Sequence, residues 1–184
     1  MKATKVLMDE HRVIERVLAS LETAARRLDT GEPMRVGFFF EVANFIKEFA
    51  DGCHHRKEEG VLFPAMEAAG VPRQGGPIGV MLAEHEEGRQ LTRAMRAAAE
   101  KVEEGDGTAR EDIVQNAQAY VGLLRQHILK EDTVLFPMAE SVIQEEKHAE
   151  VSKAFDRIEH EEIDEGIHEK YLEMAEALER EVKG

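Results

Sequence analysis

Residues 54–64 read HHRKEEGVLFP, and residues 127–137 read HILKEDTVLFP. Each stretch begins with a histidine, continues with Lys-Glu three and four positions later, and ends in Leu-Phe-Pro. A second pair of similar stretches, MDEHRVIERVL and LAEHEEGRQLT, contains His11 and His85. The partners lie 73 residues apart in the first pair and 74 in the second. The sequence therefore indicates two helix hairpins in tandem.

Three loops divide the first part of the chain. TGEP at 30–33, GVPRQGGP at 70–77 and GDGT at 105–108 are rich in Gly and Pro, which favour turns. Apolar residues recur at helical spacing between these loops, and a composition with 34% charged and 5% aromatic residues also favours helices. We therefore predict an all-α fold, an antiparallel up-down four-helix bundle of two tandem hairpins. Its helices are expected at residues 2–29, 34–69, 78–104 and 109–144.

Two prolines fall late in these helices. Pro64 lies in the second helix and Pro137 in the fourth. Because proline lacks a backbone N–H and its ring clashes with the preceding turn, we expect a kink or an early stop at both positions.

The character of the chain changes after residue 144. We predict a bundle domain at 1–144 and a C-terminal acidic helical extension at 145–184. The extension is expected to be a single fifth helix that packs along the outside of the bundle or against a second copy of the chain, giving a homodimer. Its predicted apolar stripe is Val151, Phe155, Ile158, Ile163, Ile167, Tyr171, Met174 and Leu178.

Charge and composition exclude several kinds of protein. The net charge is -14 and no cluster of Lys and Arg interrupts the acidic pattern, which argues against nucleic-acid binding. The single cysteine, Cys53, excludes a disulfide framework. No run of 18 apolar residues predicts a membrane span, and the first residues lack the apolar core of a secretory signal. We expect a cytoplasmic protein without nucleic-acid or membrane partners.

Helix geometry places four histidines at one height in the bundle. In an antiparallel hairpin, residues equidistant from the connecting loop lie at similar heights, because each helix rises about 1.5 Å per residue. The four histidines are His11, His54, His85 and His127. The midpoint in sequence between each histidine and the next falls in or beside one of the three loops.

Two carboxylates join this layer. Glu58 and Glu131 follow His54 and His127 by four residues, and residues four apart share one face of a helix. Six ligands exceed the four that one zinc ion needs, so we predict two metal ions bridged by the glutamates. Imidazole with carboxylate suits iron first and manganese second.

This ordered set resembles the hemerythrin-like, or HHE cation-binding, family over residues 1–144. His11, the His54 to Glu58 pair, His85 and the His127 to Glu131 pair match the His, HxxxE, His, HxxxE pattern of its bacterial branch. The resemblance implies a non-haem di-iron centre with an oxo or hydroxo bridge, the histidines as terminal ligands. It further implies binding or reduction of dioxygen, nitric oxide or hydrogen peroxide, in oxidative or nitrosative stress defence or iron-centre repair.

The sequence departs from oxygen-carrying hemerythrin at two positions. Arg89 stands where that protein's third helix has a second histidine, and Asp132 follows His127 by the five residues of that protein's HxxxxD motif. We prefer Glu131 as the ligand, because the internal repeat aligns it with Glu58. Four histidines would leave open metal positions, which favours chemistry on an oxidant over reversible oxygen carriage.

Other site residues remain open at this stage. His55 with Glu59 is a competing register, shifted by one residue from His54 and Glu58. His160 or His168 of the extension would be an additional ligand in one alternative. Tyr120 is expected to pack in the core or to line the pocket, and Cys53 to be a small buried residue.

The alternatives for function are of a different class. One is an oxygen, redox or iron sensor, or an iron reservoir, in which the C-terminal helix transmits or buries a change at the site. The other is a helical interaction module whose ligand set is accidental. The sequence does not decide whether the protein is an enzyme.

Overall fold

The computed structural model describes residues 3–160 and 167–183, in which every regular element is a helix. The side chains of His160, Ile167 and His168 lie outside the described part. The predicted all-α fold, a helical bundle with a C-terminal addition, is confirmed. The elements are α1 (Ala3–Asp29), α2 (Val36–Phe45), η1 (Ile46–His55), η2 (Glu58–Leu62), α3 (Phe63–Ala68), α4 (Pro77–Glu103), η3 (Gly107–Ala109), α5 (Arg110–Lys130), η4 (Glu131–Leu135), α6 (Phe136–Val142), α7 (Glu145–His160) and α8 (Ile167–Lys183).

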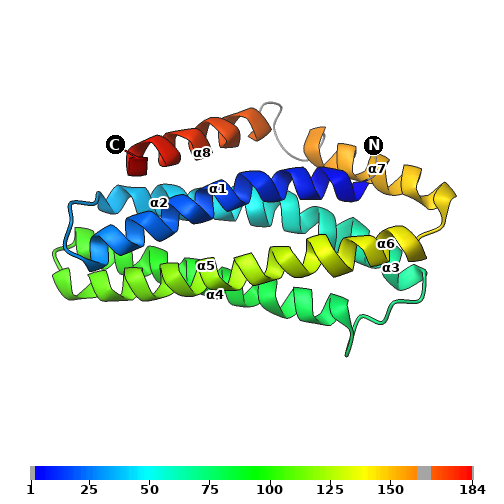
Figure 1. Cartoon of the computed structure of the whole chain (residues 1–184), viewed down its shortest axis with the longest axis horizontal. Coiled ribbons are helices and arrows are strands. Elements are labelled where there is room, and N and C mark those ends of the chain that lie inside the picture. Colours follow the sequence, from blue (N-terminus) through cyan, green and yellow to red (C-terminus); the bar gives the residue numbers. More distant parts are fainter. Residues whose placement is uncertain (1–2, 161–166, 184) are drawn as a thin grey trace.

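The bundle has four arms that run side by side along the long axis of the molecule (Figure 1). The arms are α1, the run from α2 to α3, α4, and the run from α5 to α6. Each of α1, α2, α4 and α5 contacts its two neighbours, so the arms close around one core. The α1–α2 and α4–α5 loops lie at the same end, as an up-down topology requires (Figure 1).

The core consists of two apolar clusters separated along the bundle axis. On α1 one cluster begins at Val13 and the other ends at Leu7, so His11 lies between them. The same gap occurs on the second arm, where Ala50 belongs to the first cluster and Leu62 to the second. The predicted polar layer therefore fills an interruption in an otherwise apolar core.

The interruption expected at each proline takes the form of a π-helical turn. The π-helical elements η2 and η4 end one residue before Phe63-Pro64 and Phe136-Pro137, and the helix then continues to Ala68 or Val142. In a π turn, a backbone carbonyl accepts from the N–H five residues later instead of four. The carbonyl that would face the proline nitrogen, which has no hydrogen to donate, can then accept from the next residue. The chain therefore passes both prolines without leaving its arm.

The C-terminal extension differs from the predicted single helix. It contains two helices, α7 and α8, which cover different parts of the bundle: α7 contacts α1 and η2, whereas α8 contacts α1 and α2. Val151 and Phe155 of α7 join the second core cluster, and Tyr171 and Leu178 of α8 join the first. The described residues of the stripe thus pack against the chain's own bundle, with Met174 partly buried; Ile163 and the side chain of Ile167 lie outside the described part.

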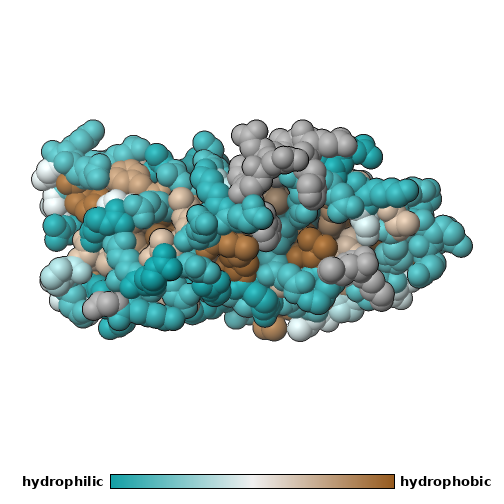
Figure 2. Space-filling model, turned by 90° about the horizontal axis from the view of Figure 1, so that it is seen from above, coloured by the Kyte–Doolittle hydropathy of each residue, from teal (hydrophilic) through white to brown (hydrophobic). Residues whose placement is uncertain are grey.

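The outer surface over α7 and α8 is mostly hydrophilic, with scattered hydrophobic patches (Figure 2). Among the described residues, no helix has the length and apolar character needed to cross a membrane.

Candidate metal centre

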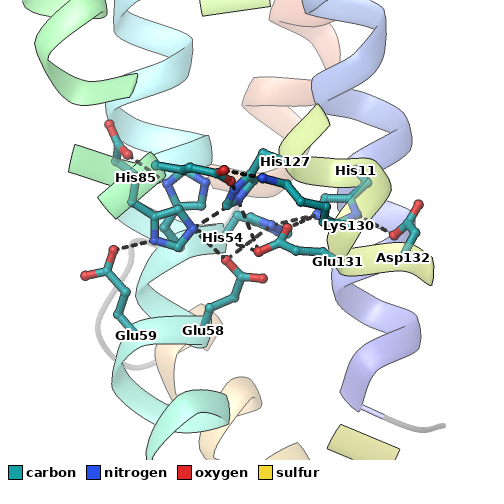
Figure 3. Close-up of polar contacts among 12 residues, drawn as sticks. His11, His54, Glu58, Glu59, His85, His127, Lys130, Glu131 and Asp132 are labelled. Carbon is teal, nitrogen blue, oxygen red and sulfur yellow. Dashed lines mark hydrogen bonds and ion pairs between the residues drawn. The ribbon is translucent and has the colours of Figure 1, made fainter. Parts of the chain in front are cut away.

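The six residues predicted as metal ligands meet in one buried layer (Figure 3). A seventh residue, His55, joins them, and all seven side chains are buried. Their potential ligand atoms form two groups that share Glu58, with all atoms of a group within 4.8 Å of one another. The groups are His11, His54, Glu58 and Glu131, and His55, Glu58, His85 and His127.

The imidazole rings turn their Nε2 atoms toward the centre of the layer. The Nε2 atoms of His11 and His54 are 3.0 Å apart, and those of His85 and His127 are 3.1 Å apart. In a neutral ring that carries its proton on Nδ1, Nε2 presents a lone pair. The lone pairs therefore face one another unless a cation or a proton lies between them.

Two carboxylates face the same space. The oxygens of Glu131 lie 3.1 Å from Nε2 of both His11 and His127, and an oxygen of Glu58 lies 3.4 Å from Nε2 of His85. All four oxygens of the two glutamates are buried without a hydrogen-bond partner. Unpaired buried carboxylates are strongly unfavourable, so the layer requires positive charge.

Each of the five histidines is held from behind by a carboxylate on Nδ1. This arrangement fixes the tautomer that leaves Nε2 free and is typical of histidines that bind metals. The Nδ1-to-oxygen distances are 2.7 Å for His11 and Asp132, 2.9 Å for His54 and Glu10, 2.9 Å for His55 and Asp51, 2.7 Å for His85 and Glu59, and 2.9 Å for His127 and Glu84.

The internal repeat explains four of these five pairs. Glu59 and Asp132 occupy corresponding positions in the repeat, and each accepts from a histidine of the other hairpin, His85 and His11. Asp132 is therefore an outer partner of His11, while Glu131 faces the layer. In each half of the repeat, the residue four positions after the histidine places its carboxylate in the layer, and the next residue places its carboxylate on the outer side of a histidine from the other hairpin.

His55 was predicted only as part of a competing register, and the structure instead places it beside His54 in the layer. The two ring centroids are 5.5 Å apart, and the ring of His55 stacks on that of His85 at 3.9 Å. Both histidines end η1, a π-helical segment with more residues per turn than an α-helix. Consecutive side chains then diverge by a smaller angle, so both can point inward. The signal available in the sequence was Asp51, four residues before His55.

The electrostatics of the layer favour bound cations. Burial acts to lower the pKa of His11 and His127, but contacts with Asp132 and Glu131 raise it to about 9 for His11, and Glu131 and Glu84 raise it to about 10 for His127. Burial acts to raise the pKa of Glu131, yet the neighbouring histidines hold it well below its usual value.

The repeated Leu-Phe-Pro sequence builds the wall on one side of the layer. The ring of Phe136 stacks on His11 at 5.4 Å, and that of Phe63 lies parallel to His85 at 6.0 Å. Both phenylalanines are fully buried. They limit the access of water to the histidines and hold the ring planes.

The remaining residues of interest lie outside the layer. Arg89 donates to Glu59 at 2.6 Å and lies 3.4 Å from Asp51, so it supports the outer partners of His85 and His55. Tyr120 is buried, and its hydroxyl group has no partner. Cys53 is a buried free thiol whose pKa burial raises to about 11. The alternative that His160 or His168 adds a ligand falls on side chains outside the described residues.

The donor set fits two divalent or trivalent metal ions. Five imidazole nitrogens and two carboxylates match the ligands that iron and manganese accept. Glu58 belongs to both groups of donors, and the oxygens of Glu131 lie near one histidine of each group. A single zinc ion would leave several of these donors unused.

Comparison with known proteins agrees with this geometry. The family model described as the hemerythrin HHE cation binding domain matches residues 2–139. An uncharacterized protein of Mycobacterium tuberculosis and one of Mycobacterium bovis are each 30% identical to the chain over 158 residues. The match covers 86% of this chain and 61% of each relative, so the chain spans less than two thirds of their length.

Proposed function

Because the chain belongs to the hemerythrin HHE cation-binding family, we propose that it holds two iron ions and binds or reduces a small oxidant. The oxidant is dioxygen, nitric oxide or hydrogen peroxide. The proposed setting is the cytoplasm, in defence against oxidative or nitrosative stress or in the repair of damaged iron centres. Manganese is the second choice of metal.

One observation carries this proposal. Four buried histidines present Nε2 to two buried glutamates that lack hydrogen-bond partners, a fifth, His55, lies in one group with Glu58, and five outer carboxylates hold Nδ1. A purely structural polar layer would pair its carboxylates with donors, since a half-satisfied network costs more than an apolar core. The arrangement is instead that of a preorganised ligand set.

We assign the ligands by group. His11 and His54 would bind one ion, and His55, His85 and His127 the other. Glu58, which belongs to both groups, and Glu131, whose two oxygens face one histidine of each group, would bridge the ions. With an oxo or hydroxo bridge, such a pair would supply electrons or an open coordination position to the oxidant.

The residues around the centre have distinct tasks. Phe63 and Phe136 exclude water, and the outer carboxylates fix the orientation and the proton of each imidazole. The structure brings five histidines into the layer, one more than predicted, because His55 joins the group of His85 and His127. The group with His11 and His54 has fewer imidazole donors, so we expect the oxidant to bind on that side.

Elemental analysis of protein isolated without air tests the proposal. We expect two irons per chain in the wild type and loss of at least one of them in His54→Ala. His148→Ala is the matched control, since His148 lies on α7 outside the layer and should leave the content unchanged. The reduced protein should then be titrated with oxygen, peroxide and nitric oxide in turn. One zinc per chain, or two irons retained in His54→Ala, would contradict the assignment.

A further inference from the structure

Two equivalent polar series of residues lead outward from the layer, one in each half of the repeat. In the first, His54 Nδ1 contacts Glu10 at 2.9 Å, and Glu10 in turn accepts a hydrogen bond from Lys57. In the second, His127 Nδ1 contacts Glu84 at 2.9 Å, and Glu84 accepts from Lys130. The same residue types thus occupy the same repeat positions.

The two polar series differ in their exposure to solvent. The side chains of Lys57 and Glu10 are 0% and 2% exposed, whereas those of Lys130 and Glu84 are 41% and 17% exposed. The cover over the first polar series comes from α7, because Lys57 lies 5.8 Å from the ring centroid of Phe155. The residues matched by the family model end at 139, so α7 follows them in the sequence.

The helix α7 also adds a negative charge, the carboxylate of Glu159, to the first polar series. Glu159 accepts a hydrogen bond from Lys57 at 2.5 Å, which gives this buried ammonium group two carboxylate partners. Oxygens of Glu10 and Glu159 and the sulfur of Cys53 lie within 4.8 Å of one another. Because the ammonium group of Lys57 contacts both glutamates, it supplies the positive charge there, and this cluster needs no metal.

We propose that Glu159 is a positioning residue for His54, so that the C-terminal extension adds a second difference between the two metal positions of the centre, beyond their numbers of histidines. Glu159 anchors Lys57, Lys57 fixes Glu10, and Glu10 orients the imidazole of His54. The inference rests on the proposed metal site. Its effect is confined to the ion held by His11 and His54, where the oxidant is expected to bind.

The physical basis is the behaviour of outer partners of metal-binding histidines. A carboxylate on Nδ1 fixes the ring and raises the basicity of Nε2, and loss of such a partner costs about 10- to 100-fold in metal affinity. With Glu159 present, the residues linked to His54 carry two negative charges, on Glu10 and Glu159, and one positive charge, on Lys57. Without Glu159, Lys57 would neutralise Glu10 alone, and Glu10 would then polarise the imidazole less.

Release of iron to a chelator tests this role. Protein loaded with Fe²⁺ without air would be mixed with excess of a colour-forming Fe²⁺ chelator, for the wild type, Glu159→Ala and Glu159→Gln. In Glu159→Ala we expect one of the two irons to leave roughly 10-fold faster and the other at its original rate. Glu159→Gln retains an acceptor for Lys57 without the charge, so it should be intermediate.

Glu150→Ala is the matched control. Glu150 lies on the same helix, is exposed, and pairs only with Lys147 among the described contacts. It should release both irons as the wild type does. A Mössbauer spectrum of the loaded Glu159→Ala variant should show a change in one of the two iron signals, which general loosening of the bundle would not produce.

The outcomes separate this inference from the proposed function. If the wild type holds two irons and Glu159→Ala releases both at the original rates, or accelerates both equally, the positioning role is overturned while the metal centre stands. If the wild type does not hold two irons, the proposed function fails and the inference fails with it. Should Glu159→Ala not fold, the comparison of Glu159→Gln with the wild type decides the matter.

Discussion

The Nε2 atoms of His11 and His54 face each other across 3.0 Å in the middle of the bundle. Both rings have an outer carboxylate on Nδ1, so neither Nε2 carries a proton when the ring is neutral. The same geometry recurs between His85 and His127 at 3.1 Å. The fold therefore holds like partial charges together and needs cations to offset them.

Removal of metal should lower the thermal stability of the protein. Binding to the folded state stabilises it by about 4 kcal/mol per ion at a thousandfold excess over the dissociation constant. Since 1 kcal/mol corresponds to about 2–4 °C in a domain of this size, two ions that together contribute about 8 kcal/mol should raise the Tm by roughly 16–32 °C. Calorimetry with and without a chelator measures this shift, and an unchanged Tm would argue against a metal that supports the fold.

His55→Ala should reduce the bound iron from two per chain to about one. His55 belongs to the group with His85 and His127, so its removal weakens that position and leaves His11 and His54 in place. Elemental analysis after dialysis provides the measurement, with His148→Ala as the control. Full retention of both irons would show that His55 is only a packing residue against His85.

Metal affinity should rise with pH between about 6.5 and 10. Burial opposes protonation of His127, but Glu131 raises its pKa from 6.5 to about 10 in the metal-free protein. A raised pKa stabilises the metal-free fold below pH 6.5, and that contribution is lost as the pH rises through about 10. Metal must displace this proton, so a competition titration at pH 6.5 and pH 8.5 should give tighter binding at the higher value. Equal affinities would contradict the raised pKa.

Cys53 should be unreactive in the native protein. Its side chain is 3% exposed and burial raises the pKa of the thiol to about 11, so little thiolate exists at neutral pH. A thiol reagent such as DTNB should react slowly with the folded chain and rapidly in denaturant. Rapid reaction under native conditions would indicate opening of the region beside His54.

Tyr120→Phe should leave the metal content unchanged and should not destabilise the metal-free protein. The hydroxyl group of Tyr120 is buried without a partner, and an unpaired buried polar group costs about 1–3 kcal/mol. Its removal should therefore be neutral or stabilising by about 1 kcal/mol, as measured by denaturant unfolding. A clear loss of stability would mean that the hydroxyl group has an ordered water or another partner.

Much of the centre could be predicted from the repeat and from helix geometry. Equal distances from three loops placed His11, His54, His85 and His127 at one height, and the i to i+4 spacing placed Glu58 and Glu131 beside them. These predictions need only a constant helical rise and known loops. The helical fold follows equally from the periodic apolar residues and the Gly- and Pro-rich loops.

The tertiary structure decided what depends on departures from the ideal α-helix and on contacts between distant segments. The π-helical end of η1 turns His55 inward beside His54, which a regular α-helical spacing does not predict. The outer partners arise from packing between arms, as when Asp132 reaches His11 across the bundle. Division of the extension into α7 and α8, and the reach of Glu159 to Lys57, likewise depend on which core surface each helix covers. Local sequence fixes the rise and face of each helix, whereas the pairing of side chains from different helices is set only when the helices pack.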